Sequence, residues 1–236
     1  MKKNSEIKQY KNIYQSTTDF EKFLKKYNAI SKKTKNVLDL GCGYGAQTNY
    51  FAQKFSNIDF LGWDYEAKAI NFAKKNNSKK NVSFNLKDIF KIKKNEKFFN
   101  LIYSIHTFCV FKNIAEPLKK LCNLSPDFIA INSLFYDGPL DVLIHIRDLK
   151  NKKVRDNHVD SDFNIHSLQF TKSVFKSFGY KIVSVQEYFP KNEIKKKNNG
   201  RGSYTIKTSF NKNSTFSGPV YLPWHFVLAK KMKIKR

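Results

Sequence analysis

The sequence lacks most of the features that mark exported or membrane-bound proteins. It has three cysteines among 236 residues, with neither a C-x-x-C metal spacing nor an even number for disulfide bonds. No uncharged apolar run approaches the roughly 18 residues that cross a membrane. No apolar segment follows the basic start MKKNSEIKQYKN. We therefore expect a protein without a membrane span, working in the reducing cytoplasm.

Acidic residues and arginine are also scarce. The 19 Asp and Glu stand against 44 Lys and Arg, a formal net charge of +25, yet only four of the basic residues are arginine. A positive charge of this size can attract phosphate groups. Sites that recognise bases or bind phosphates in a bidentate manner, however, favour the planar guanidinium group of arginine. Lys, Asn, Phe, Ile and Tyr are abundant together, as AT-rich codons would produce on any surface. Composition therefore favours codon bias over a nucleic-acid footprint.

The chain does contain a regular alternation of strand and helix patterns. Apolar residues three or four apart predict one or two amphipathic helices over 2–27, interrupted near Asp19, with Ser16 and Thr17 as alternative caps. From residue 36 onward the alternation predicts right-handed crossovers and a mostly parallel sheet. The expected strands are 37–40, 58–62, 82–86, 98–104 and 128–132, and the expected helices are 46–55, 66–75 and 114–122.

The alternation is interrupted after residue 132. Residues 133–168 predict an insertion over the edge of the sheet, and long connections of this kind usually carry function or move. Pro223 lies in the last apolar run, which favours an edge strand or a bulge there. We expect a helix over 171–178, strands over 181–189, 204–210 and 220–231, and the exposed basic loop KNEIKKKNNGRGS between the first two of these strands.

The run VLDLGCGYG is a predicted buried strand that ends in a glycine turn opening a helix. Gly41, Gly43 and Gly45 tolerate positive φ and let a ligand approach the backbone. Gly41, Gly43 and Ala46 also satisfy the dinucleotide pattern, so the glycines do not distinguish NAD from other nucleosides. Asp39 would repel a pyrophosphate but suits a ligand carrying an ammonium and a sulfonium. S-adenosylmethionine is such a ligand.

Acidic residues also end the next two predicted strands. Asp64, in GWDYEAKAI, has two carboxylate oxygens that can accept both ribose hydroxyls of a nucleoside. Asp88 and Ile89, in LKDIF, are placed to bond an adenine amine and line its ring. Each acid alone is typical of a solvated loop end. Three acids at three successive strand ends favour a nucleoside site.

These segments resemble the class I S-adenosylmethionine-dependent methyltransferases. VLDLGCGYG is similar to their glycine-rich first motif, GWDYEAKAI to the segment after the second strand, LKDIF to the acidic adenine contact, and FFNLIYSIHTF to the fourth-strand motif. The resemblance covers about residues 36–132 and departs at Asn100, where an acidic residue is usual. It implies an α/β fold: a Rossmann-like seven-stranded, mostly parallel sheet with helices on both faces, an antiparallel last strand and an N-terminal helical lid.

The resemblance implies one methyltransferase domain over 1–236. Its expected parts are N-terminal helices over 1–30, a cofactor-binding core over 36–132, a substrate-side insertion over 133–168, and a C-terminal helix and strands over 169–236. The implied cofactor is S-adenosyl-L-methionine. The residues that we expect to bind it are Asp39, Gly41, Cys42, Gly43, Gly45, Asp64, Tyr65, Asp88, Ile89 and Ser104.

Methyl transfer from a sulfonium needs in-line geometry and a proton acceptor. His106 follows the predicted fourth strand at the carboxyl end of the sheet, where ligands of such sheets bind, and is the candidate base. A packed structural histidine is the alternative. Tyr14, Tyr136 and Asp137 could line the acceptor pocket. We expect the histidines of the insertion to be surface or structural residues, namely His145, His158 and His166.

No metal centre is expected. Asp137, Asp141 and Asp162 are spaced in a way that prescribes no octahedral site, and the cysteines give no zinc set.

Three functions remain in competition. NIHSLQF and SGPVYLPWHFVLAKK resemble small bacterial methyltransferases of surface-sugar biosynthesis, which implies a small polar acceptor such as a sugar or nucleotide-linked sugar. The alternative is an RNA or DNA methyltransferase, motivated by the net charge and by a basic loop with Lys195, Lys196, Lys197 and Arg201. Enzymes that methylate the exocyclic amines of bases usually carry the motif [DNS]-P-P-[YFW] after the fourth strand. This chain has SIHTF at that position. The third is a non-catalytic nucleoside-binding protein on the same fold.

Overall fold

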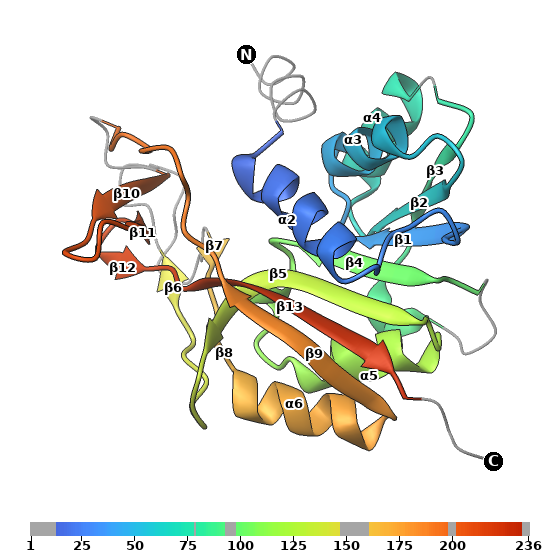
Figure 1. Ribbon diagram of the computed structural model, residues 1–236. Coiled ribbons are helices and arrows are strands. Elements are labelled where there is room, and N and C mark those ends of the chain that lie inside the picture. Colours follow the sequence, from blue (N-terminus) through green and yellow to red (C-terminus); the bar gives the residue numbers. More distant parts are fainter. Residues whose placement is uncertain (1–12, 78, 93–97, 147–160, 198–201, 233–236) are drawn as a thin grey trace.

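A central sheet with helices on both faces forms the body of the protein (Figure 1). The computed structural model describes residues 13–77, 79–92, 98–146, 161–197 and 202–232. Among these residues no helix is both long and apolar enough to cross a membrane.

The central sheet has the strand order β3-β2-β1-β4-β5-β13-β9, with the short β8 added beside β5. The first five strands of this order pair in parallel, whereas β13 runs antiparallel to both β5 and β9. The sequence prediction of a mostly parallel sheet with an antiparallel last strand is therefore confirmed. The strands are β1 (Asn36–Leu40), β2 (Asp59–Asp64), β3 (Val82–Leu86), β4 (Leu101–Ile105), β5 (Phe128–Tyr136), β8 (His166–Ser167), β9 (Tyr180–Glu187) and β13 (Trp224–Lys231).

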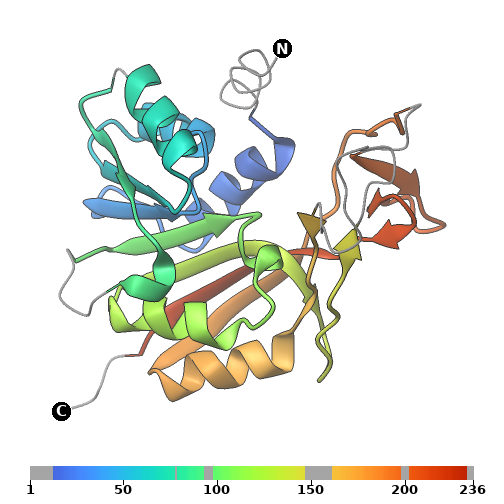
Figure 2. The same ribbon diagram turned by 180° about the vertical axis from the view of Figure 1, so that it is seen from behind.

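Two apolar cores lie on the two faces of the sheet. The first contains residues of α2 (Gln15–Lys26), α3 (Ala46–Lys54) and α4 (Ala67–Asn76), and the second contains residues of α5 (Ala115–Asn123) and α6 (Leu168–Ser177). Figure 1 and Figure 2 show these two groups of helices on opposite sides of the strands. Successive side chains along a strand pack in one core and then in the other, because they point to opposite faces of the sheet.

The N-terminal region departs from the predicted helix break near Asp19. Helix α2 begins at Gln15 and runs through Asp19, whose carboxylate pairs with Lys22 at 3.1 Å. Ser16 and Thr17 are buried inside the first turn rather than capping it. Packing against the sheet therefore decides where this helix starts. Residues 1–12 of the predicted N-terminal helices lie outside the described residues.

The C-terminal half also differs from prediction. Strand β5 continues to Tyr136, so residues 133–136 extend the parallel sheet instead of beginning an insertion. Pro223 separates β12 from β13, and β13 is an interior strand with its irregularity between Leu228 and Ala229. Of the two predicted alternatives the edge strand is wrong, because β13 pairs with both β5 and β9, whereas the strand does contain a register shift, which lies beyond Pro223.

Two small sheets extend beyond the carboxyl ends of the parallel strands (Figure 1). One joins β6 (His145–Ile146) to β7 (Ser161–Asp162). The other joins β10 (Ser203–Lys207), β11 (Asn213–Ser217) and β12 (Val220–Tyr221) in antiparallel order. Strand β11, with the polar sequence NSTFS, was not predicted. Segments from the predicted insertion and from the chain after the basic loop thus gather at the end of the sheet where the sequence motifs lie.

Candidate active site

A cavity of about 330 Å³ opens at the carboxyl ends of β1, β2, β3 and β4. It brings together Gly41, Asp64, Tyr65, Asp88 and Ile89, all of them predicted site residues. Its other walls are Leu40, Trp63, Lys87, Phe90, Thr107, Val110 and Phe111. The cavity thus joins acidic strand ends to an apolar rim, a combination that suits a nucleoside.

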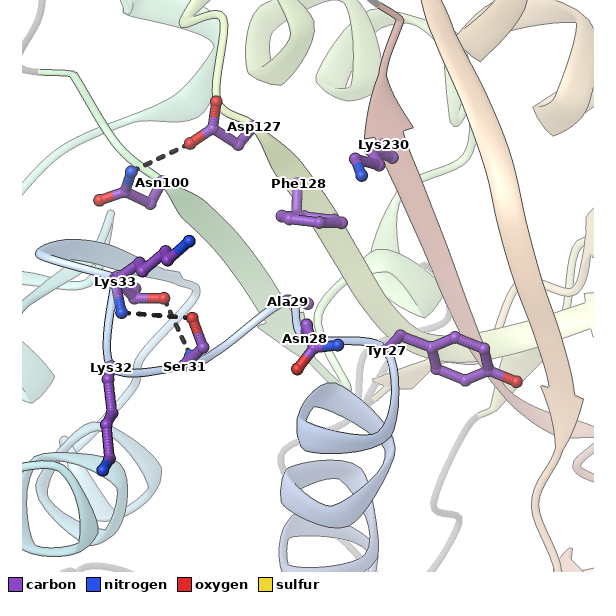
Figure 3. A pocket seen from close by; sticks show the side chains of 11 residues that line it. Tyr27, Asn28, Ala29, Ser31, Lys32, Lys33, Asn100, Asp127, Phe128 and Lys230 are labelled. Atoms are coloured by element: carbon purple, nitrogen blue, oxygen red, sulfur yellow. Dashed lines mark hydrogen bonds between the residues drawn. The ribbon is translucent and has the colours of Figure 1, made fainter.

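A larger cavity of about 620 Å³ lies at the opposite end of the sheet (Figure 3). It is bounded by the loop after α2, the starts of β4 and β5, and the end of β13, with Lys33 and Lys230 on its walls. In it Asn100 donates a hydrogen bond to Asp127 at 2.9 Å. Asn100 also accepts from the backbone amides of Lys35 and Asn36, so the residue found in place of the usual acid joins β1 to β4.

Of the glycine turn after β1, Gly41 lines the motif-lined cavity, whereas Gly43 and Gly45 are not among its lining residues. A Cβ added at Gly41 would lie 2.1 Å from Thr107 Oγ1, and one added at Gly45 would lie 2.7 Å from Phe84. At Gly43, where φ is +52°, an added Cβ meets no described atom within 4 Å. Gly41 and Gly45 are therefore required by packing, whereas Gly43 leaves open space beside the turn.

The two acids of the cavity are oriented by backbone amides. Asp64 accepts hydrogen bonds from Gly43 N at 2.8 Å and Glu66 N at 2.9 Å, one on each carboxylate oxygen. Asp88 accepts from Phe90 N at 3.0 Å and caps the short helix η1 (Ile89–Lys91). A carboxylate oxygen has more than one acceptor site, so both acids can accept further hydrogen bonds from a ligand.

Asp39 lies behind the turn rather than on the cavity wall. Its side chain is buried, and Thr48 Oγ1 donates to it at 2.6 Å. Burial raises the pKa of Asp39 to about 7, with the negative charge of Asp64 adding to the effect and the Thr48 hydrogen bond opposing it. A cation bound at the turn would favour the ionised carboxylate.

Two further predicted cofactor residues are also buried behind the turn. The Ser104 hydroxyl donates to the carbonyl of Leu40 at 2.8 Å and so ties β4 to β1. The Cys42 thiol packs in the first core, and burial raises its pKa well above the usual range. The structure does not bring these side chains to the cavity.

His106 follows β4 in the left-handed region, with φ of +60°. Its ring lies between Trp224, at 4.4 Å between ring centroids, and Tyr14, at 5.9 Å. Nε2 of His106 is 3.4 Å from Ser16 Oγ in the first turn of α2. Burial lowers the pKa of His106 to about 4, so the ring is neutral at neutral pH. Thr107, the next residue in the chain, lines the cavity at the carboxyl ends of the strands.

The remaining candidate residues serve separate contacts. Tyr136 is about half exposed, and Asp137 lies 4.0 Å from the amino group of Lys172. His145 pairs with Asp162 at 2.5 Å, and Asp141 accepts from the backbone amide of Ser167. His166 is buried, with Nε2 3.0 Å from the carbonyl of Phe108. His158 and Arg201 lie outside the described residues.

The strand order and the antiparallel β13 define the fold of a Rossmann-like methyltransferase. A family model described as a methyltransferase domain matches residues 31–199, and the chain belongs to this family. The protein is a methyltransferase that uses S-adenosylmethionine, and the resemblance found in the sequence is confirmed at this level. Membership of a family of enzymes weighs against the non-catalytic alternative.

Individual relatives agree on the class of enzyme and differ in acceptor. The chain is 31% identical over 160 residues to malonyl-[acyl-carrier protein] O-methyltransferase 2 of Ilyobacter polytropus, a match covering 66% of this chain and 59% of that relative. A methyltransferase structure from Methanosarcina mazei is similar with a TM-score of 0.61 and 11% identity, over 94% of this chain and all of that one. Magnesium protoporphyrin IX methyltransferase from Synechocystis, with bound S-adenosylmethionine, is similar with a TM-score of 0.56 and 12% identity, over 92% and 78% of the two chains. These relatives give no support to the sugar subtype.

Proposed function

We propose that this methyltransferase acts on a hydroxyl or amine of a small-molecule acceptor and that His106 accepts the acceptor's proton. The observation that carries the proposal is the neutral imidazole whose Nε2 faces a hydroxyl, Ser16 Oγ, at 3.4 Å. An acceptor hydroxyl that replaced Ser16 at this nitrogen would lie next to the segment that lines the cofactor cavity.

The residues of the cavity are assigned by their chemistry. Asp64 accepts the ribose hydroxyls, and Asp88 with Ile89 contacts the adenine. The open space at Gly43 lets the ligand approach the backbone. Asp39 and Asp64 supply negative charge for the ligand's ammonium and sulfonium. S-adenosylmethionine, when bound, supplies an activated methyl group on sulfur.

The proton balance is compatible with a weak base. As the acceptor oxygen bonds to the methyl carbon and the carbon–sulfur bond breaks, the acceptor's O–H becomes strongly acidic. A neutral imidazole within hydrogen-bond distance can then take the proton, although burial holds the pKa of His106 near 4. The same low pKa ensures that the base is not already protonated at neutral pH.

The acceptor class follows from this need for a base. A carboxylate is already deprotonated at neutral pH and requires no base, so His106 favours hydroxyl and amine acceptors over the carboxylate suggested by the malonyl relative's name. A sugar or nucleotide-linked sugar is one such acceptor, supported by the resemblance of the C-terminal segments. A phosphate on the acceptor would also suit the net charge of +25.

Transfer of a tritiated methyl group into fractionated cell extract tests the proposal. The wild type should label the small-molecule pool, and His106→Ala should lower the initial rate by about 10²-fold or more while binding the cofactor with unchanged affinity. His145→Ala removes an imidazole held by Asp162 and serves as the matched control. Label in acyl-carrier protein with full activity of His106→Ala would contradict the role of the base and indicate a carboxylate acceptor.

The second candidate function is methylation of RNA or DNA. Residues 191–197 are exposed and carry Lys195, Lys196 and Lys197. The amino group of Lys196 lies 5.1 Å from the centre of the Tyr204 ring on β10. These lysines lie on the segment between β9 and β10, beside the small sheet that contains β10, where a nucleic-acid backbone could contact them. Label in the nucleic-acid pool would favour this candidate.

A further inference from the structure

Asn132 is a buried polar residue on β5 directly behind the candidate base. It is opposite Ile105 in the parallel register, and its carbonyl accepts the backbone N–H of His106 at 2.9 Å. Its side chain has the same strand parity as Ala130 and Leu134, which pack in the core that contains α2. The side chain is fully buried, so its polar atoms need partners inside the protein.

The orientation of the Asn132 amide is determined by one hydrogen bond. Nδ2 donates to the carbonyl of His225 at 3.2 Å, and only the NH₂ group can serve that acceptor. Oδ1 is therefore directed away from His225, and it makes no hydrogen bond of ordinary geometry with a described residue. A buried acceptor without a donor carries a desolvation cost, which makes a nearby donor favourable.

The candidate donor is the ring of His106, because the backbone amide of that residue is already bound to the carbonyl of Asn132 and so holds the two residues side by side. The Asn132 side chain is the one described group that opposes the lowering of the pKa of His106 by burial, as an acceptor beside the ring does. The ring is otherwise bordered by Tyr14, Trp224 and Ser16, and the Cys109 thiol donates to its backbone carbonyl. No ionised described side chain contributes to its protonation. Because Nε2 faces Ser16, Nδ1 is the nitrogen left for Asn132.

We propose that Asn132 is a positioning residue whose Oδ1 accepts the Nδ1–H of His106 and thereby fixes the tautomer with an unprotonated Nε2. The inference rests on the proposed function, because that tautomer is the one able to take a proton from an acceptor. An amide suits this position better than a carboxylate, which would stabilise the imidazolium and retain the proton. Hydrogen bonds of this kind are often long in ligand-free structures and shorten when the substrate binds.

The test reads the tautomer directly and needs no known acceptor. Long-range nitrogen–proton NMR spectra of the full chain with labelled histidine distinguish protonated from unprotonated ring nitrogens, and His106→Gln assigns the signals of this ring. The wild type at pH 7 should show Nδ1 protonated and Nε2 unprotonated. Asn132→Leu should lose this single form and give mixed tautomers. Ser133→Ala, which changes a neighbouring and equally buried polar residue on β5, is the matched control and should leave the signals unchanged.

Two results would overturn the proposal. One is a wild-type ring protonated at Nε2, a reading that does not depend on whether Asn132→Leu folds. The other is a folded Asn132→Leu variant with the wild-type tautomer. A wild-type pattern as expected, together with full methyl transfer by His106→Ala, would leave Asn132 positioning the ring but would refute the proposed role of His106. The two failures are therefore distinguishable.

Discussion

Replacing Asp39 with asparagine tests the electrostatics of the glycine turn. An asparagine oxygen can still accept the Thr48 hydrogen bond seen at 2.6 Å, so the change mainly removes a charge. The buried carboxyl has its pKa raised from 3.8 to about 7 by burial and by Asp64. We expect Asp39→Asn to bind S-adenosylmethionine more weakly above pH 7 and to lose the pH dependence of binding.

The magnitude follows from the difference between the two pKa values. A pKa of about 7 in place of 3.8 corresponds to about 4 kcal/mol against the ionised form. Because the folded-state pKa of this acid is raised, ionising Asp39 lowers the stability of the folded protein. This loss of stability is absent below pH 3.8, grows as pH rises, and is complete above about pH 7. Asp39→Asn should therefore gain stability relative to the wild type across this window, by up to about 4 kcal/mol.

Binding should follow the same linkage in the opposite direction. A cationic ligand favours ionised Asp39, so cofactor affinity in the wild type should rise by up to about tenfold per pH unit below pH 7. At pH 6 binding should release close to one proton, which calorimetry in buffers of different ionisation enthalpy measures. The Asn variant should release none from this site. A wild type that binds equally well at pH 5.5 and pH 7.5 without proton release would refute the assignment of Asp39.

Three further predictions concern the cavity and the charged loop. Asp64→Ala should cost about 1.5 to 3 kcal/mol of cofactor affinity in calorimetry, since two ribose hydroxyls lose an anionic acceptor; a change within twofold would contradict it. Gly43→Val should fold but fail to gain thermal stability from added cofactor, whereas Gly41→Val should fail to fold because its Cβ would meet Thr107. Neutralising the lysines at 195–197 should leave methyl transfer unchanged. Loss of RNA methylation would favour the alternative, if it came with a flatter salt dependence of RNA binding. The slope of log affinity against log salt concentration would then change by about 0.9 for each duplex phosphate contact that is lost.

The gathering of the candidate cofactor residues around one cavity could be predicted because its signals are local. The turn between β1 and α3 is a continuous run of sequence. Asp64 ends β2 and Asp88 follows shortly after β3, and both strands have a short, clear apolar pattern. Parallel strands bring their carboxyl ends to one edge, so the position of each acid in its strand implied their proximity. The separate packing roles of the glycines were not predictable, because Thr107 reaches Gly41 from the loop after β4 and Phe84 reaches Gly45 from β3.

The acceptor side depends on tertiary contacts between distant segments. His106 was a candidate from its place after β4, but Ser16 and Trp224 reach its ring from two other elements, and the carbonyl of Asn132 on β5 binds its backbone amide. No spacing in the sequence links these residues. Ser16 was even predicted as a helix cap, because its hydroxyl is typical of one and its burial cannot be read from a local pattern.

A crystal structure with bound S-adenosylhomocysteine tests the central claim most directly. We predict the ribose hydroxyls within hydrogen-bond distance of the Asp64 carboxylate, the adenine beside Asp88 and Ile89, and the sulfur on the side of the turn that faces His106. A nucleoside bound instead in the cavity at the opposite end of the sheet, between Lys33 and Lys230, would contradict the account of this site.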